Sequence, residues 1–407
     1  MSYTPHLETL ESYARVMVQY ALNAGKGLFP GETVLVNAQQ CSEPLYIAIV
    51  KEIWKSGGNV ISDYHPDAFD RYGINRPLLE IGTDAQLSFF PTAYYQGIVD
   101  SIDHIIFILA DPNPRVLDGI PSERIEMLNQ SIGPFLKMRA IKDEQSKLFW
   151  TICLYGTEAA AKEVGMSVEA YWQQIIQACY LDHEDPVLKW RETAQEIEMT
   201  KKRLDDLNIA TLHITGDDVD LYVGIGPDRK WLGASGHNIP SFEIFTSPNW
   251  REVEGYIRFN EPLHYNGKVI TDISLEFKEG VVVNHNASQN KDALTAMLYA
   301  EENANKMGEF SLTDHRHSRI LRHMGHTLYD ENKGGTHGNM HIALGRSFTD
   351  AYRGEHRPTS IEQWHARGFN QAKAVHTDIV STIDRTVVAT FTNGKKMTIY
   401  RDGMFII

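Results

Sequence analysis

Residues 32–64 read ETVLVNAQQCSEPLYIAIVKEIWKSGGNVISDY and contain two short apolar runs on either side of a longer amphipathic segment. The two runs, ETVLVNA and GGNVISDY, are rich in β-branched residues and have the length of strands, whereas residues 43–56 repeat apolar side chains at helical spacing. A strand, a helix and a second strand in succession build a parallel sheet. This stretch therefore predicts an α/β domain with a mainly parallel sheet.

The segments around this unit continue the same alternation. A helix is predicted over about residues 9–24, and HIIFILADP at residues 104–112 has the pattern of a buried strand that ends in a turn. Residues 158–207 have long helical periodicity, with Pro186 as a helix start. We place the N-terminal α/β domain at residues 1–206, where the charged helix end TKKRLDDLN closes it.

The pattern changes after residue 206. Short alternating runs follow one another, among them TLHITGDDVDLYVGI at residues 211–225 and RTVVATFTNGKKMTIYRDG at residues 385–403, with Asp-Asp and Asn-Gly turn signals inside them. We therefore expect residues 207–407 to form a second, β-rich domain of mixed α+β type.

Charge and composition exclude several classes of protein. Lys and Arg number 39 against 53 Asp and Glu, a net charge of −14, which argues against a basic surface for nucleic acid or anionic lipid. The longest apolar run, residues 105–110, is too short to cross a bilayer, and the N-terminus has no export signal. The three cysteines, Cys41, Cys153 and Cys179, are widely spaced, as expected for reduced thiols. We expect a cytoplasmic protein.

Histidine is concentrated in the second half of the chain. Of 17 histidines, 13 fall at or after His213, and nine of these lie between His315 and His376. All three cysteines lie in the other half, so a metal site here would use imidazole and carboxylate ligands. Such ligands suit zinc, cobalt, manganese or iron(II) in an active site, and structural zinc fingers are excluded.

The spacing of several histidine groups argues against a role in metal binding. HGNMH at residues 337–341 has the i, i+4 separation of a zincin helix, but Gly338 replaces the glutamate that acts as base, and the glycine-rich flank disfavours a helix. The pairs His315/His317 and His323/His326 are interpreted as surface histidines.

Stronger candidates lie on predicted strands. His376 and Asp378 are two residues apart, so on a strand both side chains would point to one face. Glu243 and Glu309 each interrupt an apolar strand-like run, where an unpaired buried carboxylate would be costly and a cation would offset that cost. His341 begins the apolar run HIALG. Taken singly, each has an ordinary alternative: a satisfied core histidine, a turn-capping aspartate or an edge-strand glutamate.

Four motifs in sequence order give a more specific indication. NIPSFEIFTSP, GEFSLT, LYDENKGGTHGNMHIALG and NQAKAVHTDI resemble, in order and separation, the aminopeptidase T and aminopeptidase S family of metallopeptidases, and the resemblance spans essentially the whole chain. It implies five metal ligands, which are Glu243, Glu309, His341, His376 and Asp378. It also implies an enzyme that releases N-terminal amino acids from short peptides, commonly as a homodimer.

Three departures from the family pattern are visible. The family commonly has PGGE where this chain has Pro240, Ser241 and Phe242 before Glu243, which crowds the carboxylate. A tyrosine often follows the ligand histidine by seven residues, but here that position is Phe348 and the nearest tyrosine is Tyr352. The loop before His341 contains extra glycines and His337, which would be able to stand near the metals.

Three carboxylates and two imidazoles exceed the three protein ligands of an ordinary catalytic zinc, so we expect two divalent metal ions, of zinc, cobalt, manganese or magnesium. The general base and the native metal are left open. A rival reading uses only His341, His376 and Asp378 as the facial triad of a mononuclear iron(II) dioxygenase of the dihydroxypyridine type. In that reading Glu243 and Glu309 would be unpaired charges, which disfavours it. A third reading is a binding or scaffold protein without turnover.

Overall fold

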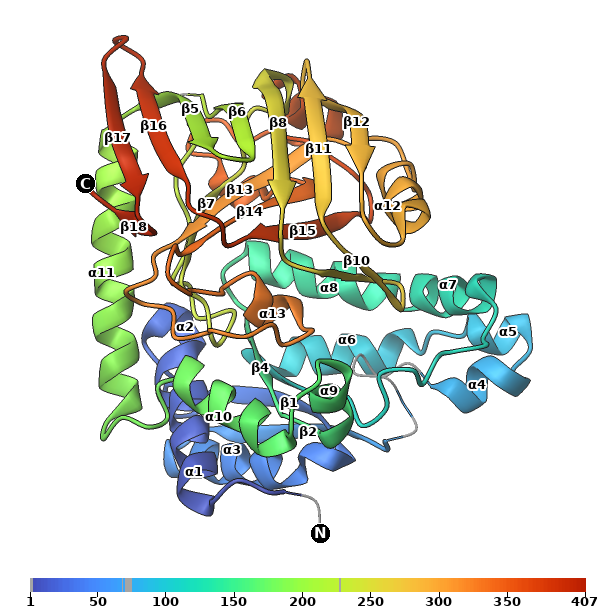
Figure 1. Ribbon diagram of the computed structural model, residues 1–407. Helices are drawn as coiled ribbons and strands as arrows, with labels where there is room; N and C mark the ends of the chain where they lie inside the picture. The colour runs from blue at the N-terminus through green and yellow to red at the C-terminus, as the bar shows by residue number, and fades with distance from the viewer. Residues whose placement is uncertain (1–2, 68, 70–74, 227) are drawn as a thin grey trace. The chain divides into compact units, whose positions relative to one another are not determined.

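The computed structural model describes residues 3–67, 69, 75–226 and 228–407. The chain forms two compact units (Figure 1). The first comprises Met1–Glu192 and a short returning segment, Ser235–Pro240, and the second comprises Thr193–Ala234 and Ser241–Ile407. The domain boundary expected near residue 206 stays a prediction.

A four-stranded parallel sheet is the centre of the first unit. The strand order is β2-β1-β3-β4, and each neighbouring pair is parallel. The strands are β1 (Thr33–Gln39), β2 (Asn59–His65), β3 (His104–Leu109) and β4 (Phe149–Leu154). Five of the six residues of β3 are buried, which is typical of a parallel strand with both faces covered.

Helices connect these strands. The helix predicted between the first two strands is α3 (Glu43–Lys55), with a proline in its first turn. The predicted N-terminal helix is interrupted, because α1 (Leu7–Val16) passes into a π-helical turn, Met17–Ala21, and the positive φ angles of Asn23 and Ala24 end the regular helix. The other helices of this unit are α2 (Leu22–Gly25), α4 (Arg76–Ile81), α5 (Asp84–Leu87), α6 (Thr92–Ser101), α7 (Ser122–Ser131), α8 (Gly133–Glu144), α9 (Glu158–Glu163) and α10 (Val168–Ala178).

The helix α11 (Pro186–Asp206) begins at the predicted proline and carries the chain into the second unit. Among the described residues, none of the helices has both the length and the apolar character needed to cross a membrane.

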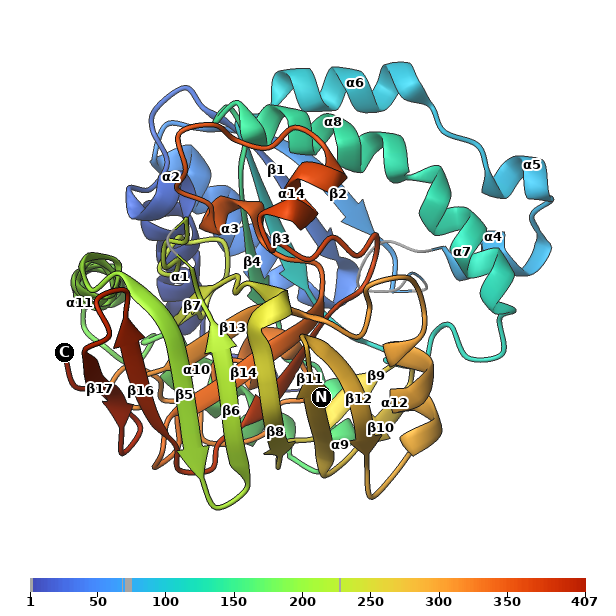
Figure 2. The same ribbon diagram turned by 90° about the horizontal axis from the view of Figure 1, so that it is seen from above.

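Antiparallel sheets build the second unit, as Figure 2 shows from above. An eight-stranded sheet has the order β12-β11-β8-β6-β5-β16-β17-β18, and a four-stranded sheet has the order β15-β14-β13-β7. The larger sheet contains β5 (Ile209–Gly216), β6 (Val219–Gly224), β8 (Val253–Phe259), β11 (Ile273–Lys278), β12 (Val281–Asn286), β16 (Thr386–Phe391), β17 (Lys396–Arg401) and β18 (Met404–Phe405). The smaller contains β7 (Glu243–Thr246), β13 (Met307–Thr313), β14 (Asn339–Gly345) and β15 (His376–Ser381).

The remaining elements of this unit are short. They are the hairpin of β9 (Leu263–Tyr265) and β10 (Lys268–Ile270), and the helices α12 (Lys291–Leu298), α13 (Thr327–Asp330) and α14 (Ile361–Ala366).

The two sheets of the second unit share one hydrophobic core. Phe310 of β13 and Ile342 of β14 belong to the same buried cluster as Leu212 and Ile257 of the larger sheet. All seven residues of β13 and of β14 are buried, so both faces of these central strands are covered. The fold class predicted from the sequence, an α/β domain followed by a β-rich α+β domain, is confirmed.

Candidate metal centre

All five residues that the sequence singled out lie on the four-stranded sheet of the second unit. Glu243 begins β7, Glu309 lies on β13, His341 lies on β14, and His376 and Asp378 lie at the start of β15. Their immediate neighbours in sequence on these strands belong to the shared core, namely Ile244, Phe310, Ile342 and Ile379. Because successive side chains alternate across a sheet, the five polar residues occupy the face opposite the core.

The register of the strands brings the side chains together. Glu309 and Asp378 are both paired with Ala343, one from each side, and His341 is paired with Ser311. The methyl group of Ala343 thus separates two carboxylates on one face of the sheet. A small side chain at this place leaves room between their oxygen atoms.

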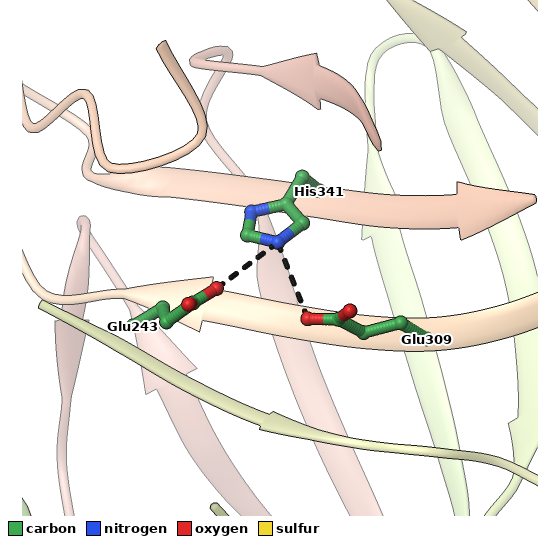
Figure 3. Close-up of side chains that lie close together, drawn as sticks. All are labelled: Glu243, Glu309 and His341. Carbon is green, nitrogen blue, oxygen red and sulfur yellow. Dashed lines mark ion pairs between the residues drawn. The ribbon is translucent and has the colours of Figure 1, made fainter. Parts of the chain in front are cut away.

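A first group of donors surrounds His341 (Figure 3). Its Nε2 atom lies 3.2 Å from an oxygen of Glu243 and 3.5 Å from an oxygen of Glu309. In Figure 3 both carboxylates point to the same edge of the imidazole ring. All three residues are buried, and their ligand atoms lie within 4.8 Å of one another.

A second group shares Glu309 with the first. The other oxygen of Glu309 lies 3.3 Å from Nε2 of His376, and the same nitrogen lies 3.7 Å from Asp378. These three residues also bring their ligand atoms within 4.8 Å of one another. Glu309 therefore belongs to two overlapping sets of three donors, with one carboxylate oxygen in contact with the histidine of each set.

The backbone fixes the orientation of His376. Its Nδ1 lies 2.8 Å from the carbonyl oxygen of Arg346, so Nδ1–H donates to that carbonyl and Nε2 faces Glu309. A hydrogen bond at one ring nitrogen leaves the other nitrogen free as a ligand, which is the usual arrangement around protein-bound metals. Within the part of the chain that the structure describes, the Nδ1 atom of His341 has no hydrogen-bond partner.

In this buried cluster an ionised side chain is unfavourable unless it has a partner of opposite charge. Burial raises the pKa of Glu243 and of Asp378 above the usual range of carboxyl groups. Burial alone would also raise the pKa of Glu309, but hydrogen bonds from His341 and His376 outweigh it and lower that pKa. Burial lowers the pKa of His376, yet Asp378 and Glu309 outweigh it and raise the pKa to about 9.

The donor set fits divalent cations. Without them, the carboxylates are balanced by protons on the imidazoles, and a metal ion bound by deprotonated ligands would take the place of those protons. Nitrogen and oxygen donors of this kind suit zinc, cobalt or manganese.

Sequence reasoning missed one residue beside this cluster, Glu331. Its carboxyl group is buried, and burial together with the nearby charges of Glu243 and Asp378 raises its pKa well above the usual range. The adjacent Asn332 ties this segment to the site, because its Oδ1 accepts a hydrogen bond of 2.6 Å from the backbone N–H of Phe242. Glu331 lies inside the motif that carries the family resemblance, but it follows a short helix in a loop, where periodicity cannot tell which side chain points inward.

The substitutions before Glu243 are accommodated in the structure. Phe242 is buried, and the hydroxyl of Ser241 lies 3.5 Å from Glu243, to which it donates. The hydroxyl of Ser311 lies 3.3 Å from the other oxygen of the same carboxylate. Both hydroxyls therefore help to orient Glu243.

Tyr352, the nearest tyrosine in sequence, does not take the place of the missing tyrosine at Phe348. The hydroxyl of Tyr352 donates to the carbonyl of His356 at 3.0 Å, and its buried ring packs against Trp364 and Phe369. The expectation that His337 would be able to stand near the metals finds no support, because His337 is half exposed and its Nδ1 lies 3.8 Å from Asp384.

Comparison with known proteins identifies the family of the chain. The pattern of the thermophilic metalloprotease (M29) family matches residues 6–405. The chain belongs to this family. The predicted resemblance, and with it the prediction of a metallopeptidase, is confirmed.

Several relatives of the M29 family match over nearly their full length. Aminopeptidase PepS of Streptococcus thermophilus is 25% identical, with 98% of this chain and 98% of the relative covered. Aminopeptidase T of Thermus aquaticus is 26% identical, with 96% and 98% covered. The solved structure of wild-type AmpT from Thermus thermophilus has a TM-score of 0.82 at 22% identity over 98% of this chain and 99% of that chain. This last similarity shows that the fold is shared.

Proposed function

We propose that this M29 protein is an aminopeptidase that uses two divalent metal ions to release N-terminal amino acids from short peptides. One observation carries the proposal: Glu309 belongs to two sets of three donors, one completed by Glu243 and His341 and the other by His376 and Asp378. Two ions that share a carboxylate would each find a histidine and a second carboxylate. The names of the relatives, which are aminopeptidases, support the reaction class.

The five residues would act as ligands, with Glu309 as the bridge between the two positions. Zinc, cobalt, manganese or magnesium ions bound there would supply Lewis acidity and an acidified water molecule. The hydrogen bond from Nδ1 of His376 to the Arg346 carbonyl fixes the orientation of the imidazole ring independently of metal binding. The free amino group of a peptide would be able to bind one of the two ions, which would favour cleavage at the first peptide bond.

Glu331 is the residue that we propose as general base. Glu331 is buried beside the donor cluster, and the hydrogen bond between Asn332 and Phe242 links its segment to the site. Burial and the charges of the cluster raise the pKa of its carboxyl group. A carboxylate held in this position would take a proton from the attacking water and return it to the leaving amine.

The iron(II) alternative has less support from the geometry. Among the described residues His341, His376 and Asp378 do not form a donor set of their own, since each of the two sets includes Glu309. A mononuclear iron site would also leave Glu243 and Glu309 as unpaired buried carboxylates.

A homodimer is part of the proposal. The helices α4 to α8 of the first unit and the segments that join them expose large apolar side chains, with Ile81 of α4 85% exposed and Phe89, between α5 and α6, 70% exposed. No residue of α7 or α8 is buried. An apolar helical surface of this kind would be covered by a second copy of the chain. Light scattering on Ile81→Lys and Phe89→Ser variants tests this, with a change from dimer to monomer as the expected result.

Two measurements test the catalytic proposal. Metal analysis of the purified protein should give two divalent ions for each chain, whereas one iron with oxygen uptake would favour the dioxygenase. Glu309→Ala and His376→Ala should keep the fold, as judged by circular dichroism, and lose hydrolysis of leucyl substrates by about 10²-fold or more. Wild-type protein that hydrolyses no unblocked dipeptide with any divalent metal would point to a scaffold protein, and normal activity in both variants would place the site elsewhere. The cytoplasmic location stays a prediction, to be tested by cell fractionation.

A further inference from the structure

A second pair of imidazoles lies outside the five-residue cluster. The Nε2 atom of His264, on β9, lies 2.9 Å from the Nε2 atom of His323, in the loop that leads to α13. The two rings are stacked, with centroids 5.0 Å apart and planes at 22°. The sequence had suggested that His323 is an ordinary surface histidine, but its side chain is largely buried and faces another histidine.

A carboxylate faces the opposite nitrogen of His323. The Nδ1 atom lies 3.3 Å from Oδ2 of Asp330, which is buried. Asp330 is held in place because it accepts hydrogen bonds from the backbone N–H groups of Met324, at 2.6 Å, and His326, at 2.9 Å. Asp330 thus places an oxygen atom beside Nδ1 of His323, while Nε2 of the same ring is turned toward His264.

We propose that His264 and His323 bind one divalent transition-metal ion of the zinc class through their Nε2 atoms, at a site separate from the catalytic cluster. Two nitrogens at about 2.0 to 2.1 Å from one tetrahedral zinc ion lie roughly 3.3 Å apart. The observed separation of 2.9 Å needs to open by only a few tenths of an ångström, roughly, to admit the ion. Water molecules complete the coordination.

The charged side chains near His323 include Asp330, Glu261 and Lys333. The nearby charges are balanced, because Glu261 is paired with Lys333 at 2.7 and 2.8 Å. The positive charge of Lys333 is therefore compensated beside the pair of imidazoles.

An ion bound by this pair would also stabilise the segment that leads to Glu331. Asp330 immediately precedes Glu331, so a metal held by His264 and His323 would fix both ends of the segment from His323 to Glu331. The metal site itself rests on its own two donors. Only its effect on Glu331 rests on the proposed function.

The test is a zinc titration of the holoenzyme, first loaded with its catalytic ions and then freed of excess metal by dialysis. Isothermal titration calorimetry should show one further equivalent of Zn²⁺ bound by the wild type. His264→Gln, at an exposed position in the middle of β9, should lose that equivalent and keep its catalytic ions, as should His323→Gln. The matched control is His213→Gln, whose surface imidazole is paired with Asp220 at 2.7 Å, and it should bind as the wild type does.

Crystals soaked in zinc should give an anomalous difference peak between the two Nε2 atoms. Absence of any further equivalent in the wild type, or equal binding in His264→Gln, overturns the proposal and leaves an imidazole–imidazole hydrogen bond. The result is independent of the catalytic centre, because Glu309→Ala should lose catalytic ions while this equivalent is kept.

Discussion

The ring of Phe348 packs edge-on against the imidazole of His376, with centroids 4.8 Å apart and planes at 71°. The ring of Phe348 also packs against that of Phe245, with centroids 5.3 Å apart, and the backbone N–H of Phe348 donates to the hydroxyl oxygen of Ser247 at 2.8 Å. Since its ring is 41% exposed, Phe348 presents an apolar edge beside a proposed ligand. The chain thus has an aromatic contact where a phenol is expected from the family pattern.

This contact predicts that Phe348→Ala removes two aromatic pairs and costs about 1 to 3 kcal/mol of unfolding free energy in urea. The freed ring of His376 should also lower kcat/KM for leucyl substrates. Phe348→Tyr retains both ring contacts and should match the wild type in stability within about 0.5 kcal/mol. Equal stability of the alanine variant and the wild type would contradict the packing role.

Ala343 separates Glu309 from Asp378 in the register of the sheet. Ala343→Leu should fill the space between the two carboxylates, lower the metal content below two ions per chain and cost about 1 to 3 kcal/mol through overpacking. Ala343→Gly should keep both ions, at a cost of about 0.5 to 1 kcal/mol. Metal analysis after dialysis and urea unfolding measure the two effects. Two tightly bound ions in the leucine variant would show that no ion occupies this space.

Strand alternation accounts for the face of the sheet on which each member of the cluster lies. Period-two alternation puts His376 and Asp378 on one face, and the same rule applied to β7 and β13 puts Glu243 and Glu309 on that face too. What alternation cannot supply is the order of the strands. That Ala343 stands between Glu309 and Asp378 depends on long-range pairing, which no local pattern contains.

Irregular segments were the least predictable. Glu331 follows a four-residue helix and precedes a glycine-rich loop, so its inward direction is fixed only by tertiary hydrogen bonds such as that between Asn332 and Phe242. The returning segment gave no signal either, because its contact with the first unit is a short bridge: the backbone N–H of Ile152 donates to His237, and that of Ile239 donates to Ile152. Backbone pairing of this kind is independent of side-chain pattern.

Glu301 fixes the backbone of residues 373–375, just before His376. Its carboxylate accepts hydrogen bonds from the backbone N–H groups of residues 373, 374 and 375, at 2.9, 2.7 and 2.7 Å. Glu301→Ala should loosen this segment and weaken metal binding by about 10-fold, as loss of supporting contacts around ligands commonly does. Competition with a fluorescent chelator measures the affinity. The control is Glu302→Gln at the exposed neighbouring position, and identical affinities in the two variants would rule out the bracing role.

Asp314 links the loop after β13 to the C-terminal strand. Burial would raise its pKa, but hydrogen bonds from Arg316 and from the backbone N–H of Phe405 outweigh burial and lower the pKa. A carboxyl whose pKa is lower in the folded than in the unfolded state stabilises the fold above the unfolded value of about 3.9, and that contribution is lost as pH falls through the folded value.

The difference in unfolding free energy between wild type and Asp314→Asn should therefore be constant from pH 5 to pH 7, roughly, and shrink below about pH 4. Urea unfolding at a series of pH values measures it. A difference that grows as the pH falls would have the wrong sign for this account.

Glu331 gives the sharpest test of the proposed chemistry. Glu331→Gln keeps the shape of the side chain and its neighbour Asn332 but removes the carboxylate that would accept a proton. We expect kcat for leucyl substrates to fall by about 10²- to 10⁴-fold, which is the usual contribution of a general base, with the metal content unchanged at two ions per chain. Glu355→Gln, at an exposed position, is the control and should behave as the wild type does. If the glutamine variant loses a metal ion together with activity, Glu331 acts as a ligand, and if it turns over normally, the base is another residue.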